Sequence, residues 1–175
     1  MHVKLKNSPG IYLVGFMGCG KTSVGELLAE KLAWDFVDLD SEIERQAGSR
    51  IVEMFDRSGE PAFRALETQA LVKQLELIKQ GRARVVALGG GAFVDEGNRA
   101  SIERFGVSLW LDAAAERLWV RVSDDDERPL ARNRAAFESL YRKRRPDYEQ
   151  ADFRVDVGSR NPEEVVEAIS QLRLI

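Results

Sequence analysis

Short apolar runs alternate with stretches of helical periodicity along most of the chain. Five runs have the length and the branched or aromatic residues of buried strands: GIYLVG (10–15), DFVDLD (35–40), RVVALGGG (84–91), VSLWLD (107–112) and FRVDV (153–157). Strands that alternate with helices pair in parallel through right-handed crossovers. The pattern therefore predicts a single α/β domain over residues 1–175, built as a three-layer sandwich.

The segments between these runs predict helices of different lengths. Helices are expected directly after the glycine loop at 15–22, near 41–48 and 51–56, from Pro61 to about Lys79, through Leu118 and Val122, and after the cap Asn161. Proline suits a first helical turn, which favours a helix start at Pro61 and again at Pro162. These helices supply the crossover connections that parallel strands require.

Composition narrows the possible functions. Hydrophobic residues make up 44% and charged residues 31% of the 175 residues, which is typical of a globular protein. A net charge of −3 gives no basic field, so we expect no nucleic-acid partner. No apolar run approaches the ~18 residues of a membrane span, and the single cysteine forms no internal disulfide. We therefore expect a cytoplasmic monomer that does not associate with membranes.

The stretch GFMGCGKT, residues 15–22, allows two interpretations. The lysines and apolar residues before it are typical of an exported leader, with Cys19 as a site of lipid attachment. However, Pro9 and Gly10 interrupt the apolar segment, and cleavage before Cys19 would cut a complete G-x-x-x-x-G-K-[ST] pattern. Because a predicted strand precedes this pattern and a predicted helix follows it, we interpret it as a Walker A phosphate-binding loop.

This loop supplies the groups that a nucleoside triphosphate requires. Glycine lets successive backbone N–H groups point at phosphate oxygens, and the helix N-terminus adds positive charge. Lys21 would reach the β- and γ-phosphates, and the Thr22 hydroxyl would bind Mg²⁺. We assign nucleotide binding to Gly18, Cys19, Gly20, Lys21, Thr22 and Ser23. The alternative, a glycine turn that only opens a helix, gives Lys21 and Thr22 no role.

Two carboxylates end the second predicted strand. Alternation along a strand places Asp38 and Asp40 on the same side, at the carboxyl end where ligands bind in such sheets. Since His2 is the only histidine and lies close to the chain start, Asp40 is the candidate to hold and deprotonate an acceptor hydroxyl. Asp38 would join the Mg²⁺ site. The structural alternative is that one aspartate only caps a helix that begins near Ser41.

Glycines and arginines indicate where an acceptor binds. The third predicted strand ends in Gly89, Gly90 and Gly91. Glycine there lets a ligand approach the backbone, although a tight turn into a helix is an alternative. Three arginines lie at separate motifs: Arg64, Arg128 and Arg144. A guanidinium matches a carboxylate or a phosphate, and Glu67 would orient Arg64 from one helical turn away. Any one of these arginines alone is more often a solvated surface residue.

The ordered set of motifs is similar to that of the shikimate kinase family. Its marks are GFMGCGKTSVG, DLDSEIE, FRALE, LGGGA, RPL and RRPDYEQAD, and the similarity extends from Ile11 to Leu172. A Walker A loop occurs in many families, whereas this ordered set is highly specific. The resemblance implies transfer of the γ-phosphate of ATP to the 3-hydroxyl of shikimate, in the route to chorismate and the aromatic amino acids. It also implies Mg²⁺ as the cofactor and ATP, ADP and shikimate as the ligands.

The resemblance further implies a fold and a role for each site residue. The fold is a five-stranded parallel sheet in the order 2-3-1-4-5, as in nucleoside monophosphate kinases. A substrate-binding helical region is expected at about 40–80 and a mobile lid at about 123–134. Arg64 and Arg144 would clamp the shikimate carboxylate, with the glycine run on its other side. Arg128 would reach the transferring phosphate from the lid, and Arg121 and Arg160 would contact adenine. Catalysis is thereby assigned to Asp40, Lys21 and Arg128.

Two other functions remain as alternatives. A related small-molecule kinase, such as one for gluconate, also handles a carboxylate-bearing acceptor, and only the full motif set argues against it. A non-catalytic nucleotide-binding regulatory module could keep the Walker loop without Asp40 or the acceptor arginines, but this chain has all of them.

Overall fold

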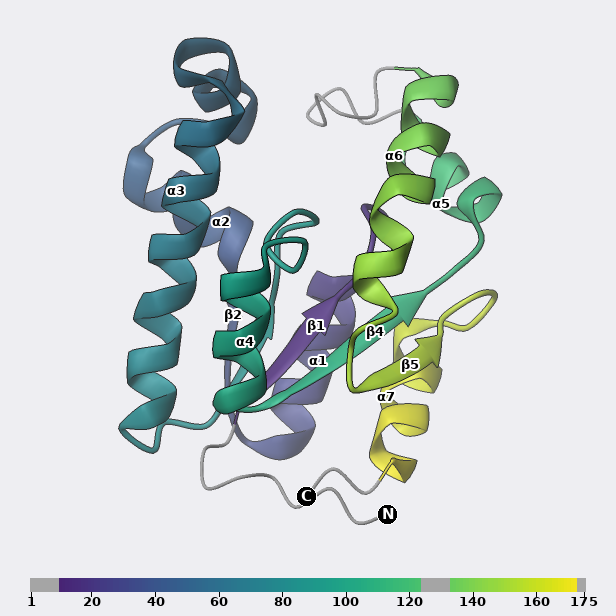
Figure 1. The fold of residues 1–175 in the computed structure, drawn as a ribbon. Coiled ribbons are helices and arrows are strands. Elements are labelled where there is room, and N and C mark those ends of the chain that lie inside the picture. Colours follow the sequence, from purple (N-terminus) through teal and green to yellow (C-terminus); the bar gives the residue numbers. More distant parts are fainter. Residues whose placement is uncertain (1–9, 124–132, 173–175) are drawn as a thin grey trace.

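The computed structural model describes residues 10–123 and 133–172, whose strands form one sheet (Figure 1). The strands are β1 (Gly10–Val14), β2 (Asp35–Asp38), β3 (Arg84–Ala87), β4 (Val107–Asp112) and β5 (Phe153–Asp156). Their order is β2-β3-β1-β4-β5, and all neighbouring strands are parallel. The five-stranded order that the family resemblance implies is therefore confirmed.

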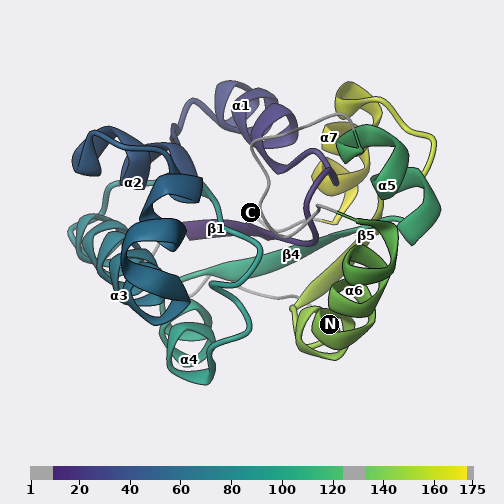
Figure 2. The same ribbon diagram turned by 90° about the horizontal axis from the view of Figure 1, so that it is seen from above.

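Helices cover both faces of the sheet. They are α1 (Lys21–Leu32), α2 (Leu39–Ala47), α3 (Ile51–Lys79), α4 (Glu96–Arg104), α5 (Ala115–Val122), α6 (Arg134–Tyr148) and α7 (Pro162–Gln171). Figure 2 shows α1 and α7 on one face and α4 and α6 on the other, while α2 and α3 lie together at one side. This is the predicted three-layer sandwich, and α3 and α6 stand on opposite sides of the strand ends (Figure 1).

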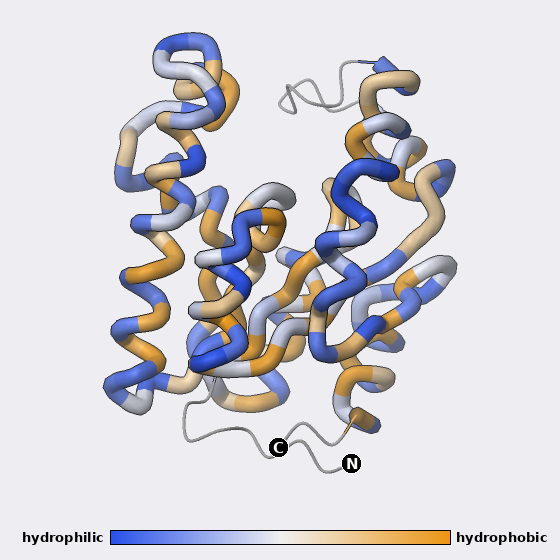
Figure 3. Tube along the Cα trace, in the orientation of Figure 1, coloured by the Kyte–Doolittle hydropathy of each residue, from blue (hydrophilic) through white to orange (hydrophobic). Residues whose placement is uncertain are grey.

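The central strands form the core. Every residue of β1 and β4 is buried, and Leu13 of β1 pairs with Ala87 of β3 and Leu109 of β4. Hydrophobic and hydrophilic positions alternate along α3 (Figure 3), which buries Phe63 and Leu71 among other side chains. Within the described ranges, no helix is both long and apolar enough to cross a membrane.

The loop between β1 and α1 depends on glycine. Gly15, Gly18 and Gly20 have φ values of 144°, 79° and 91°, a region that side-chain-bearing residues rarely adopt. Gly20 is also the N-cap of α1, and no side chain caps this helix end. The backbone therefore curls as the Walker A prediction requires, and it leaves the first amides of α1 without an intrahelical partner.

The second strand is shorter than predicted. β2 ends at Asp38, whose carboxylate accepts hydrogen bonds from the amides of Asp40 and Ser41 and so starts α2 at Leu39. Asp40 consequently lies in the first turn of α2 and not beside Asp38 on a strand, so the predicted strand alternation is wrong. Asp38 does cap the helix, as the structural alternative proposed.

The ends of three other elements, β3, α3 and α7, can be compared with their predicted positions. β3 ends at Ala87, so the three glycines lie in the following turn and not in the predicted strand 84–91. The predicted helices at 51–56 and from Pro61 both lie in α3, and a kink separates them at Gly59, which has φ 77° and ψ 170°. The cap at Asn161 is confirmed, because Asn161 and Glu164 exchange hydrogen bonds at the start of α7.

Candidate active site

Lys21 lies across the glycine loop. Its Nζ donates to the carbonyl oxygens of Gly15 at 2.9 Å and Phe16 at 3.3 Å, and it also lies 3.8 Å from Cys19 Sγ. The first amides of α1, from Lys21 to Ser23, point out of the helix end beside this ammonium. A cation and free amides at a helix N-terminus attract a phosphate group.

Cys19 turns its side chain inward. The residue is 2% exposed, and a Cβ atom at Gly15 would lie 2.9 Å from its Sγ. Its amide donates to the carbonyl oxygen of Phe16 at 3.3 Å and so helps to close the loop. Among the residues predicted to bind nucleotide, Cys19 thus lies in the loop with its thiol directed away from solvent.

Thr22 and Asp38 form the pair that the sequence assigns to the metal. Thr22 Oγ1 donates to Asp38 Oδ2 at 2.6 Å, so α1 and the end of β2 bring two oxygen groups together beside the loop. Asp38 Oδ1 is held by the amides of Asp40 and Ser41, which fixes the carboxylate. A hydroxyl and a carboxylate are hard oxygen ligands of the kind that Mg²⁺ takes together with substrate phosphates. The residues present therefore fit such an ion.

The glycine run faces a cluster of charged side chains. A Cβ atom at Gly89 would lie 2.3 Å from Glu67 Oε1 and 2.5 Å from Asp40 Oδ1. At Gly91, a Cβ atom would lie 2.2 Å from Arg64 Nη1. These glycines carry no positive φ, so the approach of charged groups and not backbone geometry requires them. The structure thus brings Asp40 and Arg64 to the same turn.

Arg64 is held between two glutamates of its own helix. Its Nη1 donates to Glu67 Oε2 at 2.8 Å, and its Nε and Nη2 donate to Glu60 Oε1 at 3.2 and 2.9 Å. The side chain of Glu67 is 2% exposed, and its Oε1 has no hydrogen-bond partner within the described residues. Burial raises the pKa of Glu67 above its ordinary value, although neighbouring Arg64 acts in the opposite direction. The predicted orienting contact between Glu67 and Arg64 is confirmed.

Arg144 reaches the same turn from α6. It is 7% exposed, and its Nη1 would lie 2.9 Å from a Cβ atom at Gly90. Tyr148 on the same helix donates from its hydroxyl to the Gly90 carbonyl oxygen. A cavity of about 470 Å³ opens here between α3, α4 and α6, and its lining includes Arg64, Glu67, Gly91, Lys143 and Arg144. Two arginines from different helices therefore share one small cavity.

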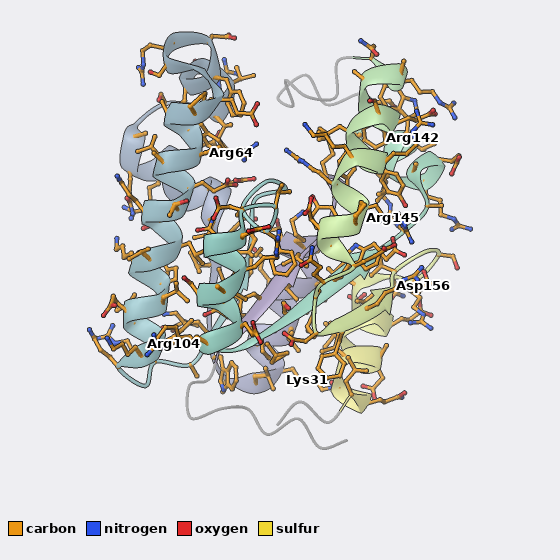
Figure 4. The ribbon with its side chains drawn as sticks, in the orientation of Figure 1. Lys31, Arg64, Arg104, Arg142, Arg145 and Asp156 are labelled. Carbon is orange, nitrogen blue, oxygen red and sulfur yellow. The ribbon has the colours of Figure 1, made fainter. Side chains whose placement is uncertain are left out.

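Arg145, the residue after Arg144, packs α6 against β4. Arg145 donates to Asp112 Oδ1 at 2.9 Å, and its guanidinium lies 4.8 Å from the centre of the Trp110 ring. Figure 4 labels Arg64 on α3 and Arg145 on α6, the two helices that flank the cavity. Arg145 thus ties α6 to the end of β4, while its neighbour turns to the glycine run.

Arg121 and Arg160 do not line the cavity that contains Arg64 and Arg144. Arg121 donates to the carbonyl oxygens of Gly18 at 3.2 Å and Gly158 at 3.5 Å, and Arg160 donates to that of Asp156 at 3.1 Å. A cavity of about 490 Å³ has Arg121, Gly158 and Ser159 in its lining. Arg121 is thus next to the phosphate loop. Arg128 and most of the expected lid at 123–134 lie outside the described residues.

A family model described as Shikimate kinase matches residues 17–173. This chain belongs to the shikimate kinase family. The shikimate kinase of Persephonella marina is 42% identical over 160 residues, covering 91% of this chain and 95% of that protein. The shikimate kinase of Cereibacter sphaeroides is 44% identical over 158 residues, covering 89% and 77% respectively.

Solved structures of shikimate kinases have the same fold. The Acinetobacter baumannii enzyme in complex with shikimate has a TM-score of 0.88 and 35% identity, covering 94% of this chain and 92% of that one. The Aquifex aeolicus enzyme has a TM-score of 0.80 and 31% identity, covering 93% and 94%. A deoxyadenosine kinase from M. mycoides, at 15% identity and a TM-score of 0.61, shares the fold alone. Membership of the family also makes the chain an ATP-dependent kinase that works with a divalent metal.

Sequence reasoning missed several residues around this shikimate kinase site. Asn98 Nδ2 donates to the Ala92 carbonyl oxygen, and Arg99 Nη1 donates to those of Phe93 and Val94, so α4 holds the turn after the glycine run. The only local signal for α4 is Asp95, whose carboxylate caps it by accepting from the Asn98 amide. The contact of Tyr148 with Gly90 depends on tertiary packing and carried no signal, whereas Glu60 lies one helical turn before Arg64 and was overlooked.

Proposed function

We propose that this chain transfers the γ-phosphoryl group of ATP to the 3-hydroxyl of shikimate, giving shikimate 3-phosphate and ADP. The observation that carries the proposal is the convergence of Arg64, Arg144 and Asp40 on one glycine turn, next to a Walker A loop. Two buried or half-buried guanidiniums suit one small carboxylate, and a neighbouring carboxylate suits the reacting hydroxyl.

Binding positions the acceptor. Arg64 and Arg144 hold the shikimate carboxylate from two helices, and the turn at Gly89, Gly90 and Gly91 lets the ring approach the backbone. Glu67 keeps Arg64 in place through its 2.8 Å hydrogen bond. Orientation of this kind accounts for much of the rate in phosphoryl transfer, where the protein does little covalent chemistry.

Asp40 acts on the reacting hydroxyl. Its carboxylate accepts the hydrogen bond of the 3-hydroxyl and takes its proton as the oxygen attacks the γ-phosphorus. Lys21 and the amides of Gly18, Gly20 and Ser23 neutralise the charge on the phosphate oxygens. Arg128 supplies a further cation to the transferring group, and Arg121 and Arg160 contact adenine. These roles follow the family pattern, and for the residues other than Arg128, which lies outside the described residues, the side-chain placements described above support them.

We propose Mg²⁺ as the divalent ion, held by Thr22 and Asp38. When bound, this ion supplies charge neutralisation at the β- and γ-phosphates. We further propose that the protein acts as a cytoplasmic monomer.

The test is a panel of acceptors. Purified protein with ATP and Mg²⁺ is incubated with shikimate, gluconate or nucleoside monophosphates, and ADP release is measured. ADP release that depends on shikimate, with a product mass that is higher by one phosphoryl group, is the expected result. Release with gluconate instead, or with no acceptor at all, would contradict the proposal.

A further inference from the structure

Glu60 occupies one of the two edges with which the Arg64 guanidinium can hold a carboxylate. A guanidinium offers Nε and one terminal nitrogen as a fork that matches two carboxylate oxygens. In this protein, Glu60 Oε1 accepts from Nε at 3.2 Å and from Nη2 at 2.9 Å, so this fork is already engaged. The remaining terminal nitrogen, Nη1, donates to Glu67.

The two glutamates differ in how firmly they are held. The side chain of Glu67 is 2% exposed and cannot leave Arg64 without losing a buried contact, whereas the side chain of Glu60 is 54% exposed. Glu60 also follows Gly59, where α3 is interrupted, and water can solvate it when it swings away. Glu67 is therefore the permanent partner of Arg64, and Glu60 is the displaceable one.

The local charge supports the same conclusion. Arg64 with two ionised glutamates forms a group of net charge −1, next to the cation of Arg144 in the same cavity, so Glu60 weakens the attraction of Arg64 for a substrate carboxylate. Displacing Glu60 into water leaves Arg64 paired with Glu67 and with the fork open. Binding of an anionic acceptor thus includes the cost of breaking one exposed ion pair.

We propose that Glu60 is an internal competitor for the substrate carboxylate and so lowers the affinity of the acceptor site. This inference rests on the proposed function, because it takes the carboxylate of shikimate as the group that displaces Glu60. The alternative is that Glu60 supports Arg64 in its binding position. The two roles predict opposite changes in the KM for shikimate.

The experiment compares Glu60→Gln and Glu60→Ala with wild type. Because an exposed ion pair contributes modestly, we expect the KM for shikimate to fall by about two- to fivefold, with the KM for ATP unchanged. Calorimetric binding of shikimate without nucleotide should tighten by the same factor. Shikimate methyl ester, a neutral analogue, should gain nothing from either substitution, since it has no anion to compete with Glu60.

Two control variants distinguish the loss of the Glu60–Arg64 contact from the general effect of removing one negative charge. Glu76→Gln removes the same charge from α3, from a side chain of similar exposure roughly 24 Å along the helix axis, and should leave both KM values unchanged. Asp95→Asn removes a negative charge from the α4 side, where the carboxylate caps its own helix, and should change the KM for shikimate less than Glu60→Gln does.

The outcomes are distinguishable. A KM for shikimate that rises or stays constant in both Glu60 variants would overturn the inference while leaving the proposed function intact. An equal fall in Asp95→Asn would also overturn it, because a field effect would then suffice. Absence of shikimate-dependent ADP release by the wild type would refute the proposed function itself, and the competitor role with it.

Discussion

Gly91→Ala tests the proposed carboxylate clamp with a single methyl group. The new Cβ would lie 2.2 Å from Arg64 Nη1, 2.3 Å from Cζ and 2.6 Å from Nη2. Because non-bonded heavy atoms pack at about 3.5–4.0 Å, the guanidinium must move by roughly 1 Å or more. The φ of Gly91 is outside the left-handed region, so the backbone accepts alanine without strain. The substitution therefore acts on Arg64 and not on the turn.

The size of the effect follows from the bonds that Arg64 makes to the substrate. A hydrogen bond to a charged group contributes about 1.5–3 kcal/mol, and about 1.4 kcal/mol corresponds to a factor of ten. Losing one such bond to the shikimate carboxylate should raise the KM for shikimate by roughly 10- to 150-fold. The KM for ATP should stay near the wild-type value, since the glycine loop at 15–20 lies on another strand end.

The assay couples ADP formation to NADH oxidation, with shikimate varied at saturating ATP and then the reverse. Gly97→Ala is the matched control, because it adds the same methyl group on α4, where the nearest atom is Asp95 Oδ1 at 3.2 Å. Thermal unfolding checks that overpacking, which typically costs about 1–3 kcal/mol, leaves Gly91→Ala folded at the assay temperature. A folded Gly91→Ala protein with a normal KM for shikimate, or with equal rises for both substrates, would refute the clamp.

Three further predictions address other parts of the molecule. Asp40→Asn should lower kcat by ~10²–10⁴-fold while ADP still binds in calorimetry, and near-normal turnover would remove Asp40 from the mechanism. Cys19, at 2% exposure, should resist a small maleimide in the folded protein, as mass spectrometry would show; rapid labelling that MgADP suppresses would instead indicate a thiol that faces the nucleotide. Hydrogen bonds from Arg45 lower the pKa of Glu42 to about 2, so Glu42 stabilises the fold above the ordinary carboxyl pKa and loses this effect as pH falls toward 2. Urea unfolding should show that Glu42→Gln is destabilised by less than about 1 kcal/mol at pH 7 and that the difference from wild type shrinks below pH 4; a constant difference would contradict the pKa.

The sequence predicted those features that depend on neighbours along the chain. The strand, glycine loop and helix around Lys21 form a local unit, and the cap at Asn161 uses residues three positions apart. The strand order followed from the family resemblance and was confirmed. Arg64 and Glu67 were correctly paired, because residues one helical turn apart on the same helix face each other.

Errors arose where one hydrogen bond decides a boundary or where packing decides a contact. The position of Asp40 was wrong because the Asp38 carboxylate starts a helix two residues earlier than strand alternation suggested. Helix α4 was missed because Ile102 is its only large apolar residue and gives no periodic pattern. The contact between Glu60 and Arg64 also joins residues one helical turn apart, but it was not predicted, since an exposed glutamate on a helix is usually solvated. Arg128 lies outside the described residues, so its role stays a prediction.

The pairing of β1 with β3 has a consequence for how such an enzyme can change over evolutionary time. The phosphate loop leaves the end of β1 and the glycine run leaves the end of β3, and the Leu88 amide still donates to the Leu13 carbonyl oxygen at 3.0 Å just below both. Neighbouring strands lie about 4.8 Å apart, so the sheet itself sets the spacing between donor and acceptor. Mutations in α3, α4 and α6 can therefore change which alcohol the site accepts. The distance between the acceptor turn and the phosphate loop stays the same, because the sheet sets it. The residues that select the acceptor can in this sense be exchanged without changing the spacing that the sheet sets.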